Sequence, residues 1–166
     1  MASNHSPEIL DQWKLFQFFL GSWDGTASGQ VGAGSVERTY SLILNNQFIE
    51  VRNRSVYPPQ EANPSGEIHE DLALVSYDKD RSLYVMREFH VEGYVNQYIL
   101  ELPSVGDHTL VFVTESIENF TPEWRARTTL EIISDDLFRE TFDLAGSDQE
   151  WACFIINEFT RSHMGE

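Results

Sequence analysis

The sequence is short of cysteine, of lysine and of positive charge in general. Cys153 is its only cysteine, so no internal disulfide can form. Lys14 and Lys79 are its only lysines, and 11 Lys and Arg residues stand against 27 Asp and Glu, which gives a formal net charge of -16. A surface this acidic repels phosphate backbones and anionic lipids, so the sequence predicts that the chain binds neither nucleic acid nor a membrane.

Long hydrophobic runs and targeting signals are also missing. No apolar stretch approaches the length of a membrane-spanning helix. The N-terminus lacks the charged and then apolar pattern of a secretory signal, and it lacks the small-residue cleavage site that follows one. Together with the single cysteine, these absences predict a cytoplasmic protein.

Aromatic and other hydrophobic residues, by contrast, are plentiful. Aromatics make up 13% and all hydrophobics 41% of the chain, which is enough to build a core and to line a cavity. A chain of 166 residues can bury most of its surface as one domain. We therefore expect residues 1-166 to form a single domain with a disordered polar tail at 1-7, and the sequence leaves open whether the chain forms a homodimer.

The hydrophobic pattern changes its period once along the chain. Apolar residues recur at helical spacing before Gly21, which predicts one amphipathic helix over about residues 8-20. After Gly21 the period is two and turn signals recur at short intervals, which is typical of an all-β sandwich or barrel. The predicted strands are 22-30, 35-44, 47-56, 67-78, 82-92, 94-102, 108-118, 124-133, 137-145 and 151-161.

The first hairpin whose register can be predicted turns at Asn45 and Asn46, because asparagine tolerates a positive φ. A two-residue turn there puts apolar contacts on one face and the opposite charges of Glu37 and Arg54 on the other. A slip by one residue would invert both faces. The inward face of this hairpin then pairs Leu44 with Gln47, Leu42 with Ile49, Tyr40 with Val51, and Arg38 with Asn53.

A second hairpin turns at residues 134-136. A three-residue loop sets Glu131 opposite Arg139 and Arg127 opposite Asp143 on one face. Glu140 falls on the other face, where a carboxylate needs a cation or several donors, and Arg38 and Arg87 are the candidates for that cation. Apart from Glu140, this second face is apolar and comprises Trp124, Ala126, Leu130, Ile132, Phe138, Phe142 and Leu144.

The hairpin near residues 92-93 has two alternative registers. A two-residue turn sends His90 to the outer face and directs Arg87, Phe89, Tyr94, Asn96 and Tyr98 inward. A three-residue turn instead aligns His90 with Tyr94, Asn96 and Tyr98. We favour the first, because Leu83, Val85, Phe89 and Val91 make its inward side the more apolar.

A helix that leads into Gly21-Ser22-Trp23 resembles the start of the calycin superfamily, the lipocalins and fatty-acid-binding proteins. The spacing Gly21-x-Trp23-x-Gly25-x-x-x-Gly29 is most similar to the nitrobindin-like, heme-binding-like branch and its uncharacterised bacterial relatives. The resemblance implies a closed antiparallel β-barrel of about ten strands. It also implies that Trp23 closes one end of the barrel and that a late basic residue, here Arg161, packs on it.

One departure from that branch concerns heme. Nitrobindins hold heme iron through a histidine on the last strand, whereas residues 151-161 contain no histidine. Heme therefore enters only as an alternative ligand, with His90 in place of the missing iron ligand.

The predicted function is the binding of a small hydrophobic or amphipathic molecule inside the barrel, since binding pockets combine apolar walls with a few convergent polar groups. Arg38 and Arg87 would be cationic anchors, which favours a ligand with one acidic or hydrogen-bonding end. A self-satisfied polar network that merely fills the barrel is the alternative. The predicted ligand-binding residues are Arg38, Tyr40, Asn53, Arg87, Phe89, His90, Asn96, Tyr98, Trp124 and Glu140.

Other chemistry has weaker support in the sequence. Glu67, His69 and Asp71 alternate onto one face of a strand, but three ligands without a second convergent segment indicate a solvated acidic strand and not a metal site. No nucleophile motif surrounds Cys153, so we expect no catalytic residues. A barrel enzyme that transfers a proton through Glu140, His90 or Tyr98 is the remaining alternative.

Overall fold

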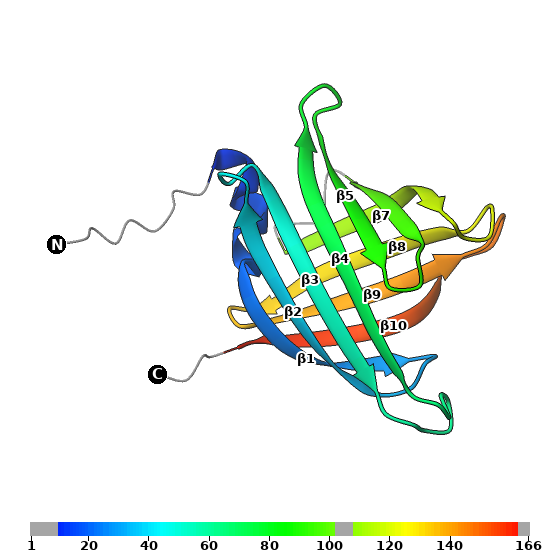
Figure 1. Cartoon of the computed structure of the whole chain (residues 1–166). Coiled ribbons are helices and arrows are strands. Elements are labelled where there is room, and N and C mark those ends of the chain that lie inside the picture. Colours follow the sequence, from blue (N-terminus) through cyan, green and yellow to red (C-terminus); the bar gives the residue numbers. More distant parts are fainter. Residues whose placement is uncertain (1–9, 102–107, 163–166) are drawn as a thin grey trace.

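Ten antiparallel strands form a closed barrel in the computed structural model, which describes residues 10-101 and 108-162. The barrel follows chain order except that β1 closes it against β10 (Figure 1). The prediction of a ten-stranded closed barrel is confirmed, whereas the predicted tail at 1-7 lies outside the described residues. The strands are β1 (Gly21–Gly29), β2 (Gly34–Ile43), β3 (Phe48–Tyr57), β4 (Glu67–Asp78), β5 (Leu83–His90), β6 (Val95–Leu100), β7 (Thr109–Glu118), β8 (Arg125–Ser134), β9 (Leu137–Ala145) and β10 (Ala152–Arg161).

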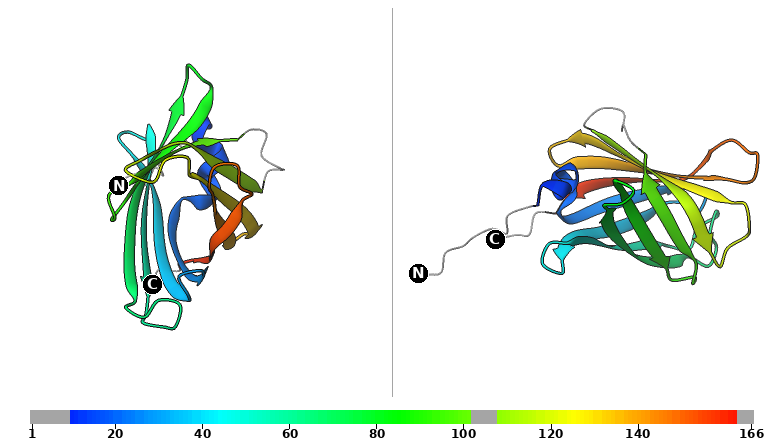
Figure 2. Two further views of the ribbon diagram at one scale, coloured as in Figure 1. Left: turned by 90° about the vertical axis from the view of Figure 1, so that its right-hand side faces the viewer. Right: turned by 90° about the horizontal axis from the view of Figure 1, so that it is seen from above.

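A short helix lies across one end of the barrel. It is a 3-10 helix, η1 (Asp11–Phe19), near the N-terminal end of the described chain (Figures 1 and 2). The side chains of Trp13, Phe16 and Phe19 are buried. The Nε1 of Trp13 donates a hydrogen bond of 2.8 Å to the carbonyl oxygen of Asn46, which ties the helix to the β2–β3 turn. Within the described ranges, no helix is long and apolar enough to cross a membrane.

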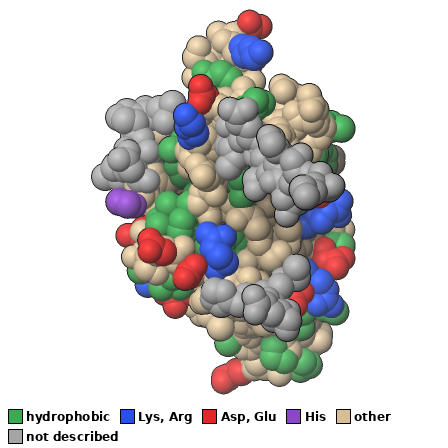
Figure 3. All heavy atoms as spheres, turned by 90° about the vertical axis from the view of Figure 1, so that its left-hand side faces the viewer, with side chains coloured by type: hydrophobic (Ala, Val, Ile, Leu, Met, Phe, Trp, Pro, Cys, Tyr) green, Lys and Arg blue, Asp and Glu red, His purple; other side chains and the backbone are tan. Residues whose placement is uncertain are grey.

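The core fills the helix end of the barrel with aromatic rings. Phe138 is fully buried and contacts Trp23 at a ring-centre distance of 4.8 Å and Phe159 at 4.6 Å. Phe19 packs on the same ring at 5.1 Å, so helix and strands share one cluster. On the outside of this end, acidic and basic side chains are interspersed with hydrophobic ones (Figure 3).

Arg161 lies over Trp23 at this closed end. Its guanidinium carbon is 4.1 Å from the Trp23 ring centre, and its two terminal nitrogens donate to the carbonyl oxygens of Leu20 and Phe18 at 3.0 and 2.8 Å. The Nε1 of Trp23 donates to the Phe19 carbonyl oxygen at 2.7 Å. One cation therefore joins the last strand to the chain segment between η1 and β1.

The β2–β3 hairpin has the predicted register. Leu42 faces Ile49, Arg38 faces Asn53, and Glu37 is beside Arg54. The turn is longer than predicted, because the ladder ends at Ile43 and Phe48. Three consecutive residues of the loop, Leu44, Asn45 and Asn46, have φ values of 48, 58 and 60°.

The β8–β9 hairpin also has the predicted pairs, with Glu131 beside Arg139 and Arg127 beside Asp143. Its loop differs from the prediction, since an irregularity between Ile132 and Ser134 lets Ser134 pair with Leu137. The bulge takes up one residue, so the pairing beyond it is unchanged.

The favoured register of the β5–β6 hairpin is wrong, and the alternative three-residue turn is present. The amide of His90 donates to the Tyr94 carbonyl at 3.2 Å, and the amide of Gly93 donates to the His90 carbonyl at 2.8 Å. Gly93 has a φ of 93°, which is the left-handed residue that a three-residue hairpin loop requires. This one extra residue turns His90 inward and Arg87 and Phe89 outward.

Candidate ligand cavity at the open end

A cavity of about 280 Å³ lies inside the barrel at the end away from η1. Inward side chains of β2 to β5, β8, β9 and β10 form its walls, together with residues of the β1–β2 and β5–β6 turns. Its size is near the lower limit for small-molecule sites, which are of the order of 300 to 1,000 Å³. The wall residues are Val31, Arg38, Asn53, Ser55, Tyr57, Glu67, His69, Asp71, Glu88, His90, Glu92, Tyr94, Thr128, Glu140, Phe142, Phe154, Ile155 and Asn157.

A buried ion pair forms the floor of the cavity. Arg38 donates through its two terminal nitrogens to both carboxylate oxygens of Glu140 at 2.6 and 2.8 Å, and the two side chains are only 8% and 10% exposed. Asn53 accepts from the Arg38 Nε at 2.9 Å, and Asn157 donates to Glu140 at 2.8 Å. The cation that Glu140 requires is therefore Arg38, and not Arg87.

Below this floor the interior is filled. The space there is about 30 Å³, and Tyr40, Phe16 and Phe112 are among its walls. That volume holds about one water molecule and no organic ligand. The ion pair thus divides the barrel into a packed lower half and an open upper half.

Two histidines and two carboxylates meet at the mouth of the cavity. Asp71 is opposite His90 in the β4–β5 ladder, and His69 precedes Asp71 by two residues on the same face. His69 Nδ1 donates to Glu92 Oε1 at 2.8 Å, while His69 Nε2 is 3.3 Å from Asp71 Oδ2. The amide of Asn53 also donates to that Asp71 oxygen, at 3.1 Å.

These contacts give the two histidines very different pKa values. Burial opposes the charged form of His69, but its hydrogen bonds to Asp71 and Glu92 outweigh burial and raise its pKa to about 9. Burial dominates at His90 and lowers its pKa to about 4. One imidazole is therefore a cation at neutral pH, and its neighbour, at a ring-centre distance of 5.6 Å, is neutral.

Glu88 adds a further carboxyl group to this wall. Burial raises the pKa of Glu88 well above its ordinary value, and the nearby carboxylates of Asp71 and Glu140 act in the same direction. Asp71 shows the opposite shift, because the hydrogen bond from His69 and the charge of Arg38 outweigh its burial and lower its pKa. A neutral acid and a carboxylate thus lie on neighbouring strands.

Of the predicted binding residues, some lie at the cavity, two are buried elsewhere in the barrel, and three point outward. Arg38, Asn53, His90 and Glu140 line the cavity, and Tyr40 lies beneath its floor. Asn96 and Tyr98 are buried and bonded to each other, with 2.8 Å from the Asn96 amide to the Tyr98 hydroxyl, and neither is a wall residue.

The prediction that Arg87, Phe89 and Trp124 point inward is wrong. Arg87 donates to Glu118 at 2.7 Å on the outside of the barrel, where its side chain is 45% exposed. Phe89 is on the same outer face, as the three-residue turn dictates. Trp124 precedes β8 and packs on the exposed ring of Phe120, so it is outside the ladder that would have turned it inward.

The sequence reasoning missed several wall residues that share one signal. Glu67, His69 and Asp71 alternate on β4, and Glu88 and His90 alternate on β5, with Glu92 two positions further on. Combined with the three-residue turn, that alternation predicts two converging polar segments. With the favoured two-residue turn, Glu88 and His90 would point outward, so the convergence of the two segments was not predicted.

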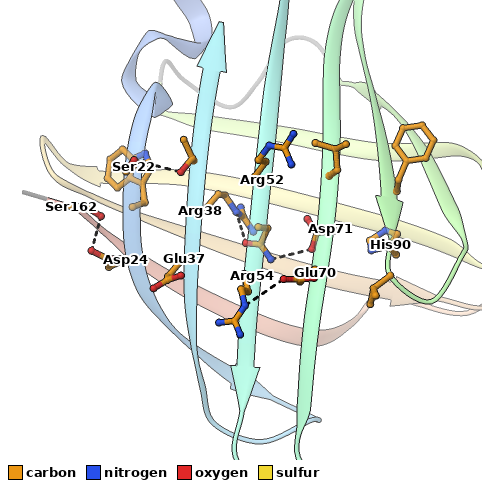
Figure 4. A pocket seen from close by; sticks show the side chains of 16 residues that line it. Ser22, Asp24, Glu37, Arg38, Arg52, Arg54, Glu70, Asp71, His90 and Ser162 are labelled. Atoms are coloured by element: carbon orange, nitrogen blue, oxygen red, sulfur yellow. Dashed lines mark hydrogen bonds and ion pairs between the residues drawn. The ribbon is translucent and has the colours of Figure 1, made fainter. Parts of the chain in front are cut away.

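A second, larger hollow of about 690 Å³ crosses the outer face of β1 to β5 (Figure 4). Its rim carries charged side chains, including the ion pair of Arg54 and Glu70 at 3.4 Å. Figure 4 also shows Arg38, Asp71 and His90 in a row on β2, β4 and β5. The outer hollow is more open to solvent, so the cavity inside the barrel is the better candidate site.

Heme does not fit the residues of the cavity. On the last strand, the inward residue at the floor is Asn157, and its amide is already bonded to Glu140. Among the described residues, the wall is acidic on balance, with five carboxyl groups against one guanidinium and two imidazoles, which disfavours the two propionates of heme. The two histidines of the cavity are on β4 and β5: His69 is engaged by Glu92 and Asp71, and His90 is stacked on Tyr94.

Comparisons with known proteins support the fold. No protein-family model matches the chain, and no curated protein matches it in sequence. The crystal structure of Rv2717c from M. tuberculosis is similar with a TM-score of 0.72 and 14% sequence identity, over 94% of this chain and 100% of that one. The S-type phycobiliprotein lyase CPES from Guillardia theta is similar with a TM-score of 0.58 and 10% identity, over 94% of this chain and 95% of that one. These similarities support the fold alone, a closed antiparallel β-barrel.

Proposed function

We propose that this chain binds a small amphipathic molecule in the cavity at the open end, and that the polar end of this molecule donates hydrogen bonds or carries a positive charge. The observation that carries the proposal is the cavity of about 280 Å³ with Asn157 at its floor, whose buried Oδ1 accepts from no donor among residues 10-101 and 108-162. A buried polar atom without a partner costs on the order of 1–3 kcal/mol, which a ligand that donates to it would recover.

The charge of the walls supports a donor or a cation as the polar end. Among the described residues, the carboxyl groups of Glu67, Asp71, Glu88, Glu92 and Glu140 face one guanidinium and two imidazoles. The guanidinium of Arg38 already makes a bidentate pair with Glu140, so it has no free edge for an acidic ligand. This reverses the sequence-based expectation that Arg38 and Arg87 anchor an acid.

The remaining walls favour an apolar body for the ligand. Phe142, Phe154 and Ile155 line the side formed by β9 and β10, and Tyr94 lies across the mouth. Aromatic and aliphatic side chains on one side, with hydrogen-bonding groups on the other, are typical of sites for amphipathic molecules.

The neighbours in structure are consistent with this proposal, because one of them is a phycobiliprotein lyase built on a barrel of the same type. Membership in the calycin superfamily is a further part of the proposal, and the contact of Arg161 with Trp23 supports it. The glycine spacing of β1 is the feature that favours the nitrobindin-like branch within it. Heme is not included as a ligand, because the cavity residues do not fit it.

The experiment compares two ligands that share an indole ring and carry polar ends of opposite charge. Purified protein in buffer with a chelator is titrated with tryptamine and with indole-3-acetate, and the change in Tm and the binding heat are measured. We expect tryptamine to bind at least tenfold more tightly. Equal binding, or tighter binding of the acid, would contradict the proposed polarity.

Two neighbouring residues of β10 provide the variants. Ile155→Trp fills the cavity, whereas Ile156→Trp adds the same bulk on the outer face, where Ile156 is exposed. We expect Ile155→Trp to abolish amine binding and Ile156→Trp to retain it. Equal loss in both variants would place the ligand elsewhere, and a heme spectrum that titrates to one equivalent of added hemin would overturn the exclusion of heme.

A further inference from the structure

Three potential metal ligands come together at the mouth of the cavity. His69 on β4, His90 at the end of β5 and Glu92 in the following turn each offer an atom, and all these atoms are within 4.8 Å of one another. The sequence supplied only the β4 segment, which was insufficient for a site. The β5–β6 turn supplies the second convergent segment.

His90 is the strongest indication that something binds here. Its side chain is only 6% exposed, and neither ring nitrogen has a hydrogen-bond partner in the part of the chain that the structure describes. Glu88 Oε2 is 3.5 Å from His90 Nε2 without hydrogen-bond geometry. A neutral imidazole always has one nitrogen lone pair to donate, and here it is buried and directed toward His69 and Glu92.

His69 has the second contact that metal-bound histidines have in known sites. While Nδ1 faces Glu92 at 2.8 Å, Nε2 is 3.3 Å from the Asp71 carboxylate. Asp71 is itself held by the amide of Asn53 at 3.1 Å. A carboxylate behind a histidine fixes the ring orientation and the tautomer, and it increases the basicity of the ligating nitrogen.

We propose that His69 Nδ1, one ring nitrogen of His90 and the Glu92 carboxylate bind a divalent transition metal of the zinc type. Two imidazoles and one carboxylate form a donor set that zinc accepts, with a fourth position free for water or another ligand. In the metal-free protein a proton between His69 and Glu92 occupies the place of the metal. The free position would be directed into the cavity, since all three residues are walls of it.

The binding test uses the metal alone and does not depend on any organic ligand. Untagged protein is treated with EDTA, dialysed, and titrated with Zn²⁺ by calorimetry and with Co²⁺ by visible absorption. We expect one equivalent to bind, with Co²⁺ bands of the four-coordinate type. Wild-type protein that binds neither metal at micromolar concentration would overturn the proposal.

The variants assign the ligands. We expect His90→Phe and Glu92→Gln each to weaken Co²⁺ binding at least a hundredfold and to remove the four-coordinate spectrum. Asp71→Asn, which keeps all three ligands, should weaken it about ten- to a hundredfold. His108→Gln is the matched control, because His108 is exposed and outside the cavity, and it should bind as the wild type does.

A folding defect does not obscure the result. Circular dichroism establishes whether each variant folds, and Glu92, which is 41% exposed, provides a rim variant if His90→Phe does not fold. Metal binding that is equal in Glu92→Gln, His90→Phe and His108→Gln would contradict the assignment. Amine binding in EDTA tests the proposed ligand separately, so either proposal can fail without the other.

Discussion

The two ends of the barrel are built from the same strands, but one end is a packed aromatic core and the other is a polar cavity. At the helix end, the rings of Trp23, Phe138 and Phe159 pack together and against η1, and the space beside them is about 30 Å³. At the other end, the inward positions carry imidazoles and carboxyls around a cavity of about 280 Å³. The comparison shows that stability and binding are separated along the barrel axis, with the Arg38–Glu140 pair at the boundary.

Removal of a ring from the closed end should have the largest effect. Phe138→Ala removes a side chain with 0% exposure, and we expect it to lower the free energy of unfolding by about 4 kcal/mol. Phe142→Ala, four residues further on β9, removes a half-buried cavity wall and should cost about 1–2 kcal/mol. Urea unfolding measures both. Equal losses would mean that the two ends are not energetically distinct.

Disruption of the boundary pair should cost somewhat less. Glu140→Gln leaves the buried Arg38 guanidinium without its counter-charge, and we expect a loss of about 3 kcal/mol in urea unfolding. The double variant Arg38→Met with Glu140→Met removes both charges and should recover most of that loss. A double variant that is less stable than Glu140→Gln would show that the pair is itself a net source of stability.

Removal of the cation over Trp23 should have a smaller effect. Arg161→Met keeps much of the aliphatic contact but removes the donors to the Leu20 and Phe18 carbonyls, at a cost of about 1–2 kcal/mol. Arg139→Met is the control, because its exposed ion pair with Glu158 is worth at most about 0.5 kcal/mol. If the two variants unfold at the same urea concentration, Arg161 does not fasten the closed end.

The last effect appears only at high pH and concerns Tyr40, just below the floor. Burial raises the pKa of Tyr40 from 10.0 to about 12, so the folded state favours the neutral phenol. The stability gained is fully present below pH 10 and is lost as the pH rises through about 12. Phenolate absorbance should therefore show a late-titrating tyrosine that is missing in Tyr40→Phe. If the variant instead loses a tyrosine that titrates near pH 10 and keeps the late titration, Tyr40 is not buried as described.

Much of the architecture could be predicted from local patterns. The period-two alternation defines ten strands, and the charge pairs of Glu37 with Arg54 and of Glu131 with Arg139 define two registers. Both predicted registers are confirmed although the turns differ from those assumed. The bulge and the longer loop lie next to the turns, so they leave the pairing of the strands unchanged.

The candidate site was less predictable, because it depends on one turn. A single residue more in the loop at 91-93 reverses every side chain of β5 relative to β6. Hydrophobicity favoured the wrong alternative, since Phe89 and Val91 are large and apolar yet exposed on the outer face. Polar residues commonly point inward where a cavity binds a ligand. The number of apolar residues on each face of a strand is therefore a poor guide to which face points inward at such a site.

By itself, the sequence determined the class of fold, the helix that covers one end, and the need of Glu140 for a cation, because each of these follows from periodicity or from the cost of a buried charge. Only the tertiary structure decided which arginine meets Glu140 and that His69, His90 and Glu92 converge. These contacts are between residues of different strands, and they depend on how the barrel closes and on the register of each strand pair. The spacing of residues along one strand does not specify that register.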